Sequence, residues 1–149
     1  MTEVEYARGW LRGTFDGEGS CTFGIYEGHQ RFDYEQLPYF KVMCRVQLYN
    51  TDPQIIQRTS EYLHLFGIEH TIQSYKRKSL LRWGKKPMWV VRVGKAAGYK
   101  RFLDEVGFTN LQKQTVLRVI VAYTNREKYR NPQVRRKLGA RKPRQPIQL

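Results

Sequence analysis

The sequence predicts an α+β fold in which two strand hairpins alternate with helices, in the order αββαββαα. Apolar residues recur at helical spacing in four segments and alternate with polar residues in four others, and these two patterns carry the prediction. The chain has 149 residues, enough for one domain with a sizeable core. We place that domain at residues 1–124, followed by a basic extension at 125–149, partly helical or disordered.

The composition indicates a polyanionic partner. The chain carries 27 Lys and Arg against 13 Asp and Glu, a formal net charge of +14. Aromatic residues make up 13% of the chain, which favours a folded protein over a disordered basic one. No signal peptide or membrane span is recognisable, so we expect a soluble, intracellular protein of a prokaryotic cytoplasm or an organelle, without a membrane partner. The two cysteines, Cys21 and Cys44, are expected to be a buried thiol pair.

The first predicted helix covers residues 3–16 and leads directly into two carboxylates. Thr2 and Glu5 form a potential capping box at its start, and its expected apolar stripe consists of Val4, Ala7, Leu11 and Thr14. Asp16 and Glu18 follow at the helix end, where the partial negative charge of the helix makes acids unfavourable by several tenths of a kcal/mol. A divalent cation at that end would remove the cost, so this placement suggests a metal site.

Two other interpretations of these acids compete with a metal site. Residues 16–19, with the sequence Asp-Gly-Glu-Gly, also suit an ordinary polar turn. Residues 16–27 have the length of an EF-hand loop, but Cys21 stands where such a loop requires glycine. The residues after it alternate as in a strand, which speaks against a calcium loop.

The first predicted hairpin, residues 20–28 and 39–49, has one apolar and one polar face. Its apolar face is expected to carry Cys21, Phe23, Ile25, Phe40, Val42, Cys44, Val46 and Leu48. The polar face carries Thr22, Tyr26, Lys41, Arg45, Gln47 and Tyr49. Solvent contact alone would account for a polar face. Arg and Gln, however, match the edges of guanine and adenine in the major groove, and with the net charge they favour a DNA-binding face.

The second predicted hairpin, residues 68–77 and 88–93, extends that face. A long basic loop at 78–87 joins its strands, and phosphate contact is the functional interpretation of such a loop. The DNA-binding residues expected here are Thr71, Gln73, Tyr75, Arg77, Lys78, Arg82, Lys85, Lys86 and Arg92.

Three further helices complete the predicted domain. One starts at Pro53, with Thr51 or Asp52 as its cap, and ends at Gly67. The next covers 95–106 and ends at Gly107. The last is capped by Thr109 or Asn110 and is expected to bury Leu111, Leu117, Ile120 and Val121. In the basic extension, a short helix is possible around Val134 to Leu138.

The segment Leu11-Arg12-Gly13-Thr14-Phe15-Asp16-Gly17-Glu18-Gly19 resembles the nine-residue motif of LAGLIDADG homing endonucleases. It keeps the leucine, the first glycine, both acids and the last glycine of that motif. It departs at Arg12, where the family prefers alanine, and at Glu18, where aspartate is commoner. The resemblance covers about residues 3–124 and implies an αββαββα fold with a curved, four-stranded, antiparallel DNA-binding sheet.

The resemblance also implies an activity. A chain with one motif copy would be an intron-encoded homing endonuclease that binds double-stranded DNA as a homodimer at a long palindromic or pseudo-palindromic site. It would hydrolyse both strands with Mg²⁺, for which Ca²⁺ or Mn²⁺ can substitute, and leave short 3′ overhangs. The alternative on the same fold is an intron RNA maturase, or a nucleic-acid-binding protein that does not cleave.

The site residues are carried over from the family by position. The metal is expected at Glu18 and Gly17, with Asp16 in a supporting position. Further catalytic groups would be Asn50, Gln54 and Lys113, of which Lys113 is the only lysine between Leu111 and Ile120. The dimer interface would contain Gly9, Arg12, Gly13 and Asp16. Without the resemblance, Lys113 is an exposed helix lysine, and Gly9 and Gly13 mark a tight contact of the helix with a sheet within one chain.

Overall fold

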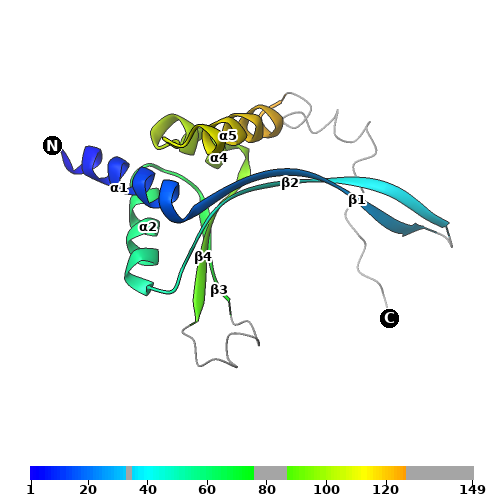
Figure 1. The fold of residues 1–149 in the computed structure, drawn as a ribbon, viewed down its shortest axis with the longest axis horizontal. Helices are drawn as coiled ribbons and strands as arrows, with labels where there is room; N and C mark the ends of the chain where they lie inside the picture. The colour runs from blue at the N-terminus through cyan, green and yellow to red at the C-terminus, as the bar shows by residue number, and fades with distance from the viewer. Residues whose placement is uncertain (33–34, 76–86, 127–149) are drawn as a thin grey trace.

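The computed structural model describes residues 1–32, 35–75 and 87–126 (Figure 1). These residues form α1 (Glu3–Glu18), β1 (Gly19–Phe32), β2 (Glu35–Asn50), α2 (Pro53–Leu65), β3 (His70–Tyr75), β4 (Met88–Val93), α4 (Lys95–Glu105) and α5 (Leu111–Thr124). The predicted α+β fold and the predicted order of elements are confirmed. The loop residues 78–86 and the extension from 127 onward lie outside the described residues.

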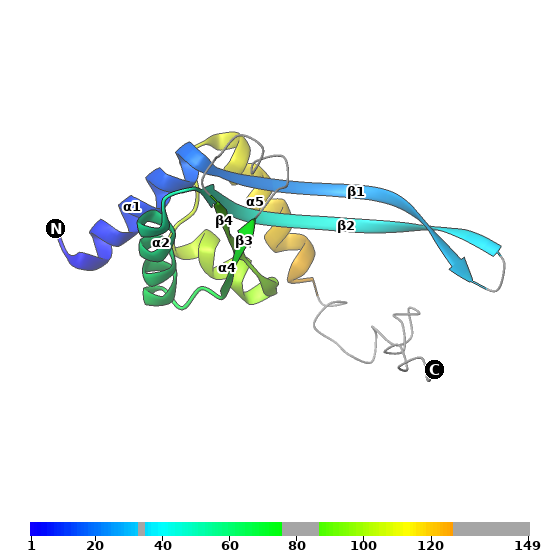
Figure 2. The same ribbon diagram turned by 90° about the horizontal axis from the view of Figure 1, so that it is seen from below.

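All four strands form one antiparallel sheet in the order β1-β2-β4-β3. The helices gather on one side of the sheet, and the sheet curves so strongly that β1 and β2 run away from β3 and β4 (Figures 1 and 2). The β1–β2 hairpin extends well beyond the helices. The other, concave side of the sheet is left open by the described elements.

Local sequence signals explain where the helices begin and end. Thr2 and Glu5 form the predicted capping box, with hydrogen bonds of 2.8 and 3.2 Å between side chains and backbone N–H groups. Asp52 accepts a hydrogen bond from the backbone N–H of Gln54 and so caps α2. Gly67 and Gly107 take φ values of +65° and +63° after α2 and α4, a conformation that glycine adopts without strain.

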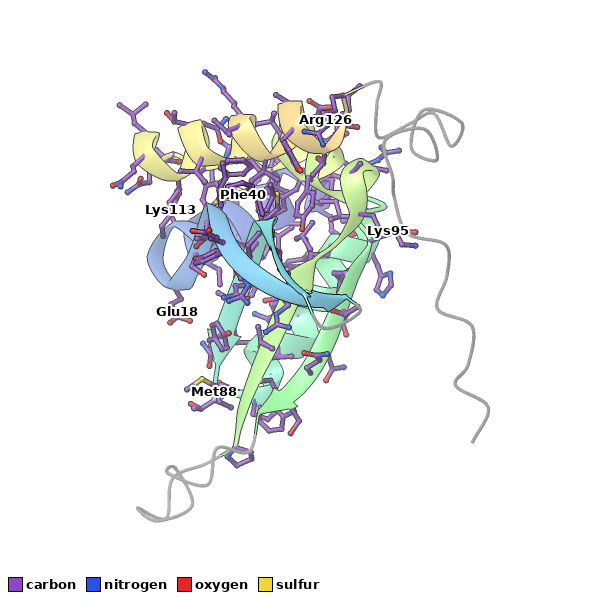
Figure 3. All side chains as sticks on the ribbon, turned by 90° about the vertical axis from the view of Figure 1, so that its right-hand side faces the viewer. Glu18, Phe40, Met88, Lys95, Lys113 and Arg126 are labelled. Atoms are coloured by element: carbon purple, nitrogen blue, oxygen red, sulfur yellow. The ribbon has the colours of Figure 1, made fainter. Side chains whose placement is uncertain are left out.

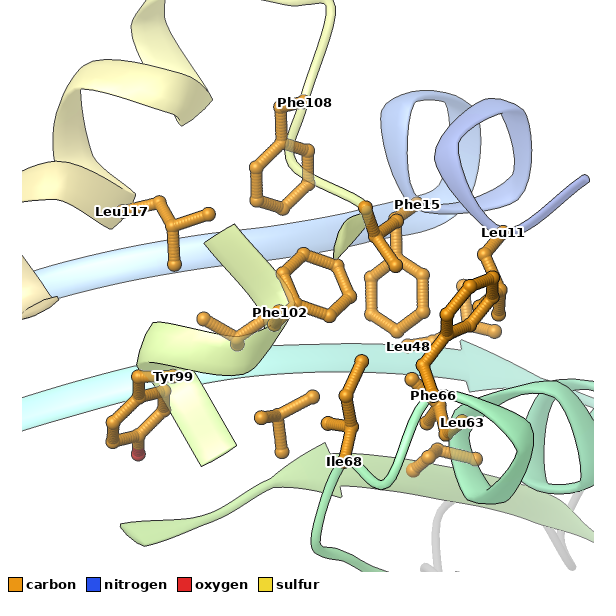
Figure 4. Close-up of a cluster of buried hydrophobic side chains, with 14 of the residues drawn as sticks. Leu11, Phe15, Leu48, Leu63, Phe66, Ile68, Tyr99, Phe102, Phe108 and Leu117 are labelled. Atoms are coloured by element: carbon orange, nitrogen blue, oxygen red, sulfur yellow. The ribbon is translucent and has the colours of Figure 1, made fainter. Parts of the chain in front are cut away.

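The core lies between the helices and the sheet and has an aromatic centre (Figure 4). Phe15 of α1 packs edge-on against Phe102 of α4, with ring centroids 4.9 Å apart, and Phe108 joins them. The buried stripe of α1 is Ala7, Leu11 and Phe15, not the predicted stripe that began at Val4 and ended at Thr14. Phe15 follows Leu11 by four residues, so both side chains lie on the same face of the helix.

Three other apolar positions are more exposed than their pattern predicts. Leu111, expected in the core, is 82% exposed, because it is the first residue of α5 and precedes the part of the helix that packs against the sheet. Ile25 and Phe40 lie on the helix-facing side of the hairpin but are 64% and 73% exposed. They lie where the hairpin has passed the end of the helical layer.

The first hairpin is longer than its alternation predicts, because its strands continue to Phe32 and start again at Glu35. Pro38 falls inside β2, opposite His29. β2 pairs with β4 only from Val46 to Asn50, so its far half has β1 as its single partner. A proline is tolerated at such an edge, where one side of the strand has no ladder to complete.

None of the helices in the described part of the chain is long and apolar enough to cross a membrane.

Candidate catalytic centre and nucleic-acid interface

The C-terminal end of α1 receives its positive charge from a distant lysine. The ammonium of Lys113, on α5, donates hydrogen bonds to the backbone carbonyls of Asp16, Gly19 and Phe15, at 2.7, 2.8 and 3.2 Å. These carbonyls lie in and just beyond the last turn of α1, where a helix leaves its carbonyl groups without partners. A cation at this end is favourable. The unfavourable acids are therefore already offset by Lys113, and their position alone does not require a metal.

The Asp16 side chain also joins the end of α1 to the start of α5. Its carboxylate accepts hydrogen bonds from the backbone N–H groups of Thr109 and Asn110, at 3.0 to 3.2 Å. These N–H groups precede α5, whose first turn is capped by the Asn110 side chain. Asp16 and Lys113 thus hold the end of α1 against the start of α5 from both sides. The Asp16 carboxylate is occupied by this contact within the chain.

Glu18, the last residue of α1, has an exposed carboxylate (Figure 3). Its Oε2 atom accepts a hydrogen bond of 2.5 Å from the Asn50 side-chain amide at the end of β2. The Asn50 carbonyl oxygen accepts from the backbone N–H of Asp52, which fixes the orientation of the amide. Among the described residues, ion pairs join Arg8 to Glu105 and Lys95 to Glu69, and none includes Glu18.

Close packing explains the glycine that follows. A Cβ atom on Gly19 would come within 2.6 Å of the carbonyl oxygen of Phe15 and within 2.8 Å of its ring. A side chain at this position would force α1 away from β1. Gly19 therefore lets the strand start directly beneath the helix end, and this keeps Glu18 at the edge of the sheet.

The open face of the sheet carries the predicted polar residues. In the observed register Thr22 lies opposite Arg45, Tyr26 opposite Lys41, and Gln47 opposite Arg92. Thr71 continues the row on β3, opposite Arg92. Since alternate residues of a strand share a face, the two hairpins form one continuous surface of amide, hydroxyl, aromatic and basic groups. Ser20, on β1 opposite Gln47, completes this row and was not predicted.

Arg92 is fixed at the middle of this surface. Its Nε donates to the side-chain oxygen of Gln47 and one terminal nitrogen donates to that of Gln73, both at 3.1 Å. Gln47 is only 6% exposed, so this predicted DNA-binding residue is buried, and its side-chain oxygen accepts the bond from Arg92. The guanidinium keeps further N–H groups for a ligand, because it has five donors in a fixed plane. The predicted residues Arg77, Lys78, Arg82, Lys85 and Lys86 lie outside the described residues, as does the side chain of Tyr75.

Residues 5–107, most of the described domain, match the family model of the LAGLIDADG-like domain. The chain belongs to this family. No curated protein and no solved structure matched the chain. The match places the protein among the homing endonucleases and maturases, proteins that bind nucleic acid.

The LAGLIDADG helix, α1, exposes the glycines that were predicted at a dimer interface. A Cβ atom on Gly9, Gly13 or Gly17 would meet no atom of the described residues within 4 Å. The alternative of a tight contact within the chain is therefore wrong for the part of the chain that the structure describes. Arg12 has a partner, because its Nε donates to the carbonyl of Val106 at 2.7 Å. This bond ties the exposed side of α1 to the end of α4.

Of the predicted catalytic residues, the structure brings Glu18, Asp16, Asn50 and Lys113 to the end of the LAGLIDADG helix. Gln54 lines a shallow hollow between α1 and α2 together with Trp10 and Arg58. In the described residues its side chain makes no hydrogen bond to Glu18 or Asn50. The roles of all these residues in catalysis remain predictions.

The two cysteines are free, and each is half-buried on the helix-facing side of the first hairpin. Burial raises the pKa of the Cys21 thiol to about 12; nearby Lys113 lowers it in part, and Cys44 adds a smaller upward contribution. Burial also raises the pKa of Cys44. Both thiols are therefore protonated near neutral pH and behave as small apolar groups.

Proposed function

We propose that the protein is a metal-dependent, site-specific DNA endonuclease that acts as a homodimer on a long palindromic or pseudo-palindromic site. The observation that carries the proposal is the Glu18 carboxylate. It is exposed, oriented by Asn50 and free of ion pairs within the described residues, at the margin of an open sheet face rich in polar and basic groups.

The donors at this helix end suit Mg²⁺, which binds oxygen ligands. Glu18 has its Oε1 atom without a hydrogen bond among the described residues. Lys113 binds the carbonyls of Phe15, Asp16 and Gly19, and no described residue donates to the carbonyl of Gly17. Glu18 and Gly17 would therefore hold the ion. When bound, it would supply a Lewis acid and an activated water for phosphodiester hydrolysis.

The neighbouring residues would act through position and charge. Asn50 holds the Glu18 carboxylate in one orientation. An ammonium has three N–H donors, and Lys113 uses as many on three carbonyls. Lys113 is therefore a poor proton donor as placed, and we assign it the role of a fixed positive charge that also positions the helix end. Such a charge would stabilise the negative charge that develops on a phosphate.

The homodimer is proposed because one protomer offers too few carboxylates to bind the metal alone. The described residues contain no group of three or more His, Cys, Asp or Glu that could bind a metal. One protomer offers one suitable carboxylate, and a second copy would supply the other across a two-fold axis. Gly9 and Gly13 leave room for two α1 helices to approach closely. Two-fold symmetry in the protein predicts a palindromic target.

The hairpin sets the length of DNA that one protomer can follow. β1 has 14 residues. At about 3.3 Å per residue it spans about 46 Å, the length of about 14 base pairs at 3.4 Å each. This supports a long recognition site of more than 20 base pairs for the dimer, by the same order-of-magnitude estimate.

The test compares cleavage of a randomised palindromic DNA library by the wild type, Glu18→Gln and the control Glu61→Gln, an exposed glutamate of α2. We expect double-strand cleavage with Mg²⁺ by the wild type and the control only. In Ca²⁺, all three should bind the selected DNA. Equal cleavage by Glu18→Gln would remove Glu18 from the mechanism. Binding without cleavage by the wild type would favour a maturase or a non-cleaving binder.

A further inference from the structure

The helix-facing side of the first hairpin continues as an apolar surface beyond the helices. We define the hairpin patch as Ile25, Phe40 and Val42. Ile25 lies opposite Val42, and Phe40 is the next residue of β2 on the same face. Ile25 and Phe40 are largely exposed, whereas Val46 and Leu48, farther along the same face, are fully buried. Figure 2 shows the hairpin projecting past α5.

Single exposed apolar residues are common on protein surfaces, but a contiguous group marks a binding surface. The alternation that produces this patch is the same one that buries the inner half of β2. A DNA ligand would not select it, because the polar and basic residues lie on the opposite side of the sheet. Glu27, opposite Phe40, adds a negative charge at its margin.

We propose that the hairpin patch binds the chain's own C-terminal segment, through Val134 and Leu138. The described chain ends beside the patch: Tyr123, at the end of α5, packs edge-on against Phe23, with ring centroids 5.6 Å apart. Ile25 is the next residue of β1 on that face, about 6.6 Å farther along the strand. Residues 127–149 follow from this point, so the segment starts within reach of the patch.

The chemistry of the segment matches the patch. Val134 and Leu138 are spaced by four residues, so in a helix they share one face and can cover two neighbouring side chains. Residues 135–137, between them, are Arg-Arg-Lys, which complements Glu27. A second copy of the chain is a weaker occupant. A buried aromatic contributes about 150–250 Å², and three side chains fall well short of the roughly 800 Å² per partner of a stable interface.

The proposal predicts specific contacts in solution. In the full-length protein with labelled Ile, Leu and Val methyl groups, we expect NOEs between the Ile25 methyl group and those of Val134 and Leu138. They should vanish in a mixture of two differently labelled samples that reports only contacts between copies. NOEs that persist in the mixture would assign the patch to a second copy. Their absence from both samples would overturn the proposal.

A double-mutant cycle tests the energetic coupling. Leu138→Ser should lower the melting temperature by about 2–4 °C, the shift expected for a modest loss of packing in a domain of this size. Leu149→Ser, the matched control at the end of the chain, should change it by less than about 1 °C. In a Phe40→Ser background the effect of Leu138→Ser should disappear, because contacting residues are not additive. An unchanged effect in that background would contradict the contact, and the result is independent of cleavage.

Discussion

Replacing Lys113 with methionine removes the positive charge that stabilises the end of α1 while keeping a side chain of similar length. The wild-type ammonium makes three hydrogen bonds to backbone carbonyls. Hydrogen bonds that involve a charged group contribute about 1.5–3 kcal/mol. Lys113 is partly solvent-accessible, so we discount the sum of the three bonds strongly and expect the variant to lose about 2 kcal/mol in the free energy of unfolding.

For a domain of this size the loss corresponds to a melting temperature about 4–8 °C lower. The assay is thermal unfolding followed by circular dichroism. Lys100→Met, at an exposed position of α4, is the matched control and should unfold within about 1 °C of the wild type. If Lys113→Met were equally unaffected, Lys113 would not stabilise the helix end, and the argument from the carbonyl contacts would be refuted.

Three further predictions concern the dimer, the sheet face and pH. Gly13→Leu should convert a dimer into a monomer in analytical ultracentrifugation without unfolding the chain, since no described atom would meet its Cβ; an intact dimer would refute the α1 interface. Arg92→Ala should reduce discrimination at one base pair of the site by roughly 10- to 100-fold in a binding selection, the value of one bidentate base contact. A uniform loss of affinity for all sequences would instead indicate a phosphate contact. Burial lowers the pKa of His70 below its usual 6.5, so the contribution of His70 to stability should be full above pH 6.5 and should be lost as the pH falls further. His70→Gln should therefore reduce the decrease of the melting temperature below pH 6.5. An unchanged decrease would exclude His70 as its source.

The sequence was most informative where a local pattern and the tertiary structure agree. Alternation in β2 assigned Lys41, Arg45 and Gln47 to one face, and the register confirms that placement. The capping box at Thr2 and the glycine at position 67 also appear in the structure as predicted. These features depend on contacts within a few residues, which a single sequence contains.

Contacts between segments far apart in the sequence could not be predicted from such local patterns. Nothing near Lys113 in the sequence indicates that its ammonium reaches the end of α1, 97 residues away from Asp16. Burial of Phe15 and exposure of Leu111 likewise depend on where the helical layer begins and ends. The residue types of the candidate site were predictable from the sequence. Only the structure shows that the Asp16 carboxylate is hydrogen-bonded within the chain, whereas the Glu18 carboxylate is exposed and could bind a metal.

The central claim is that Glu18 brings a divalent cation to the bound DNA. The most direct measurement is the binding of Mn²⁺ to the protein–DNA complex, followed by electron paramagnetic resonance, for the wild type and for Glu18→Gln. We expect saturable binding in the wild-type complex that is lost in the variant, while both proteins retain the DNA. Equal Mn²⁺ binding by the two complexes would contradict the assignment.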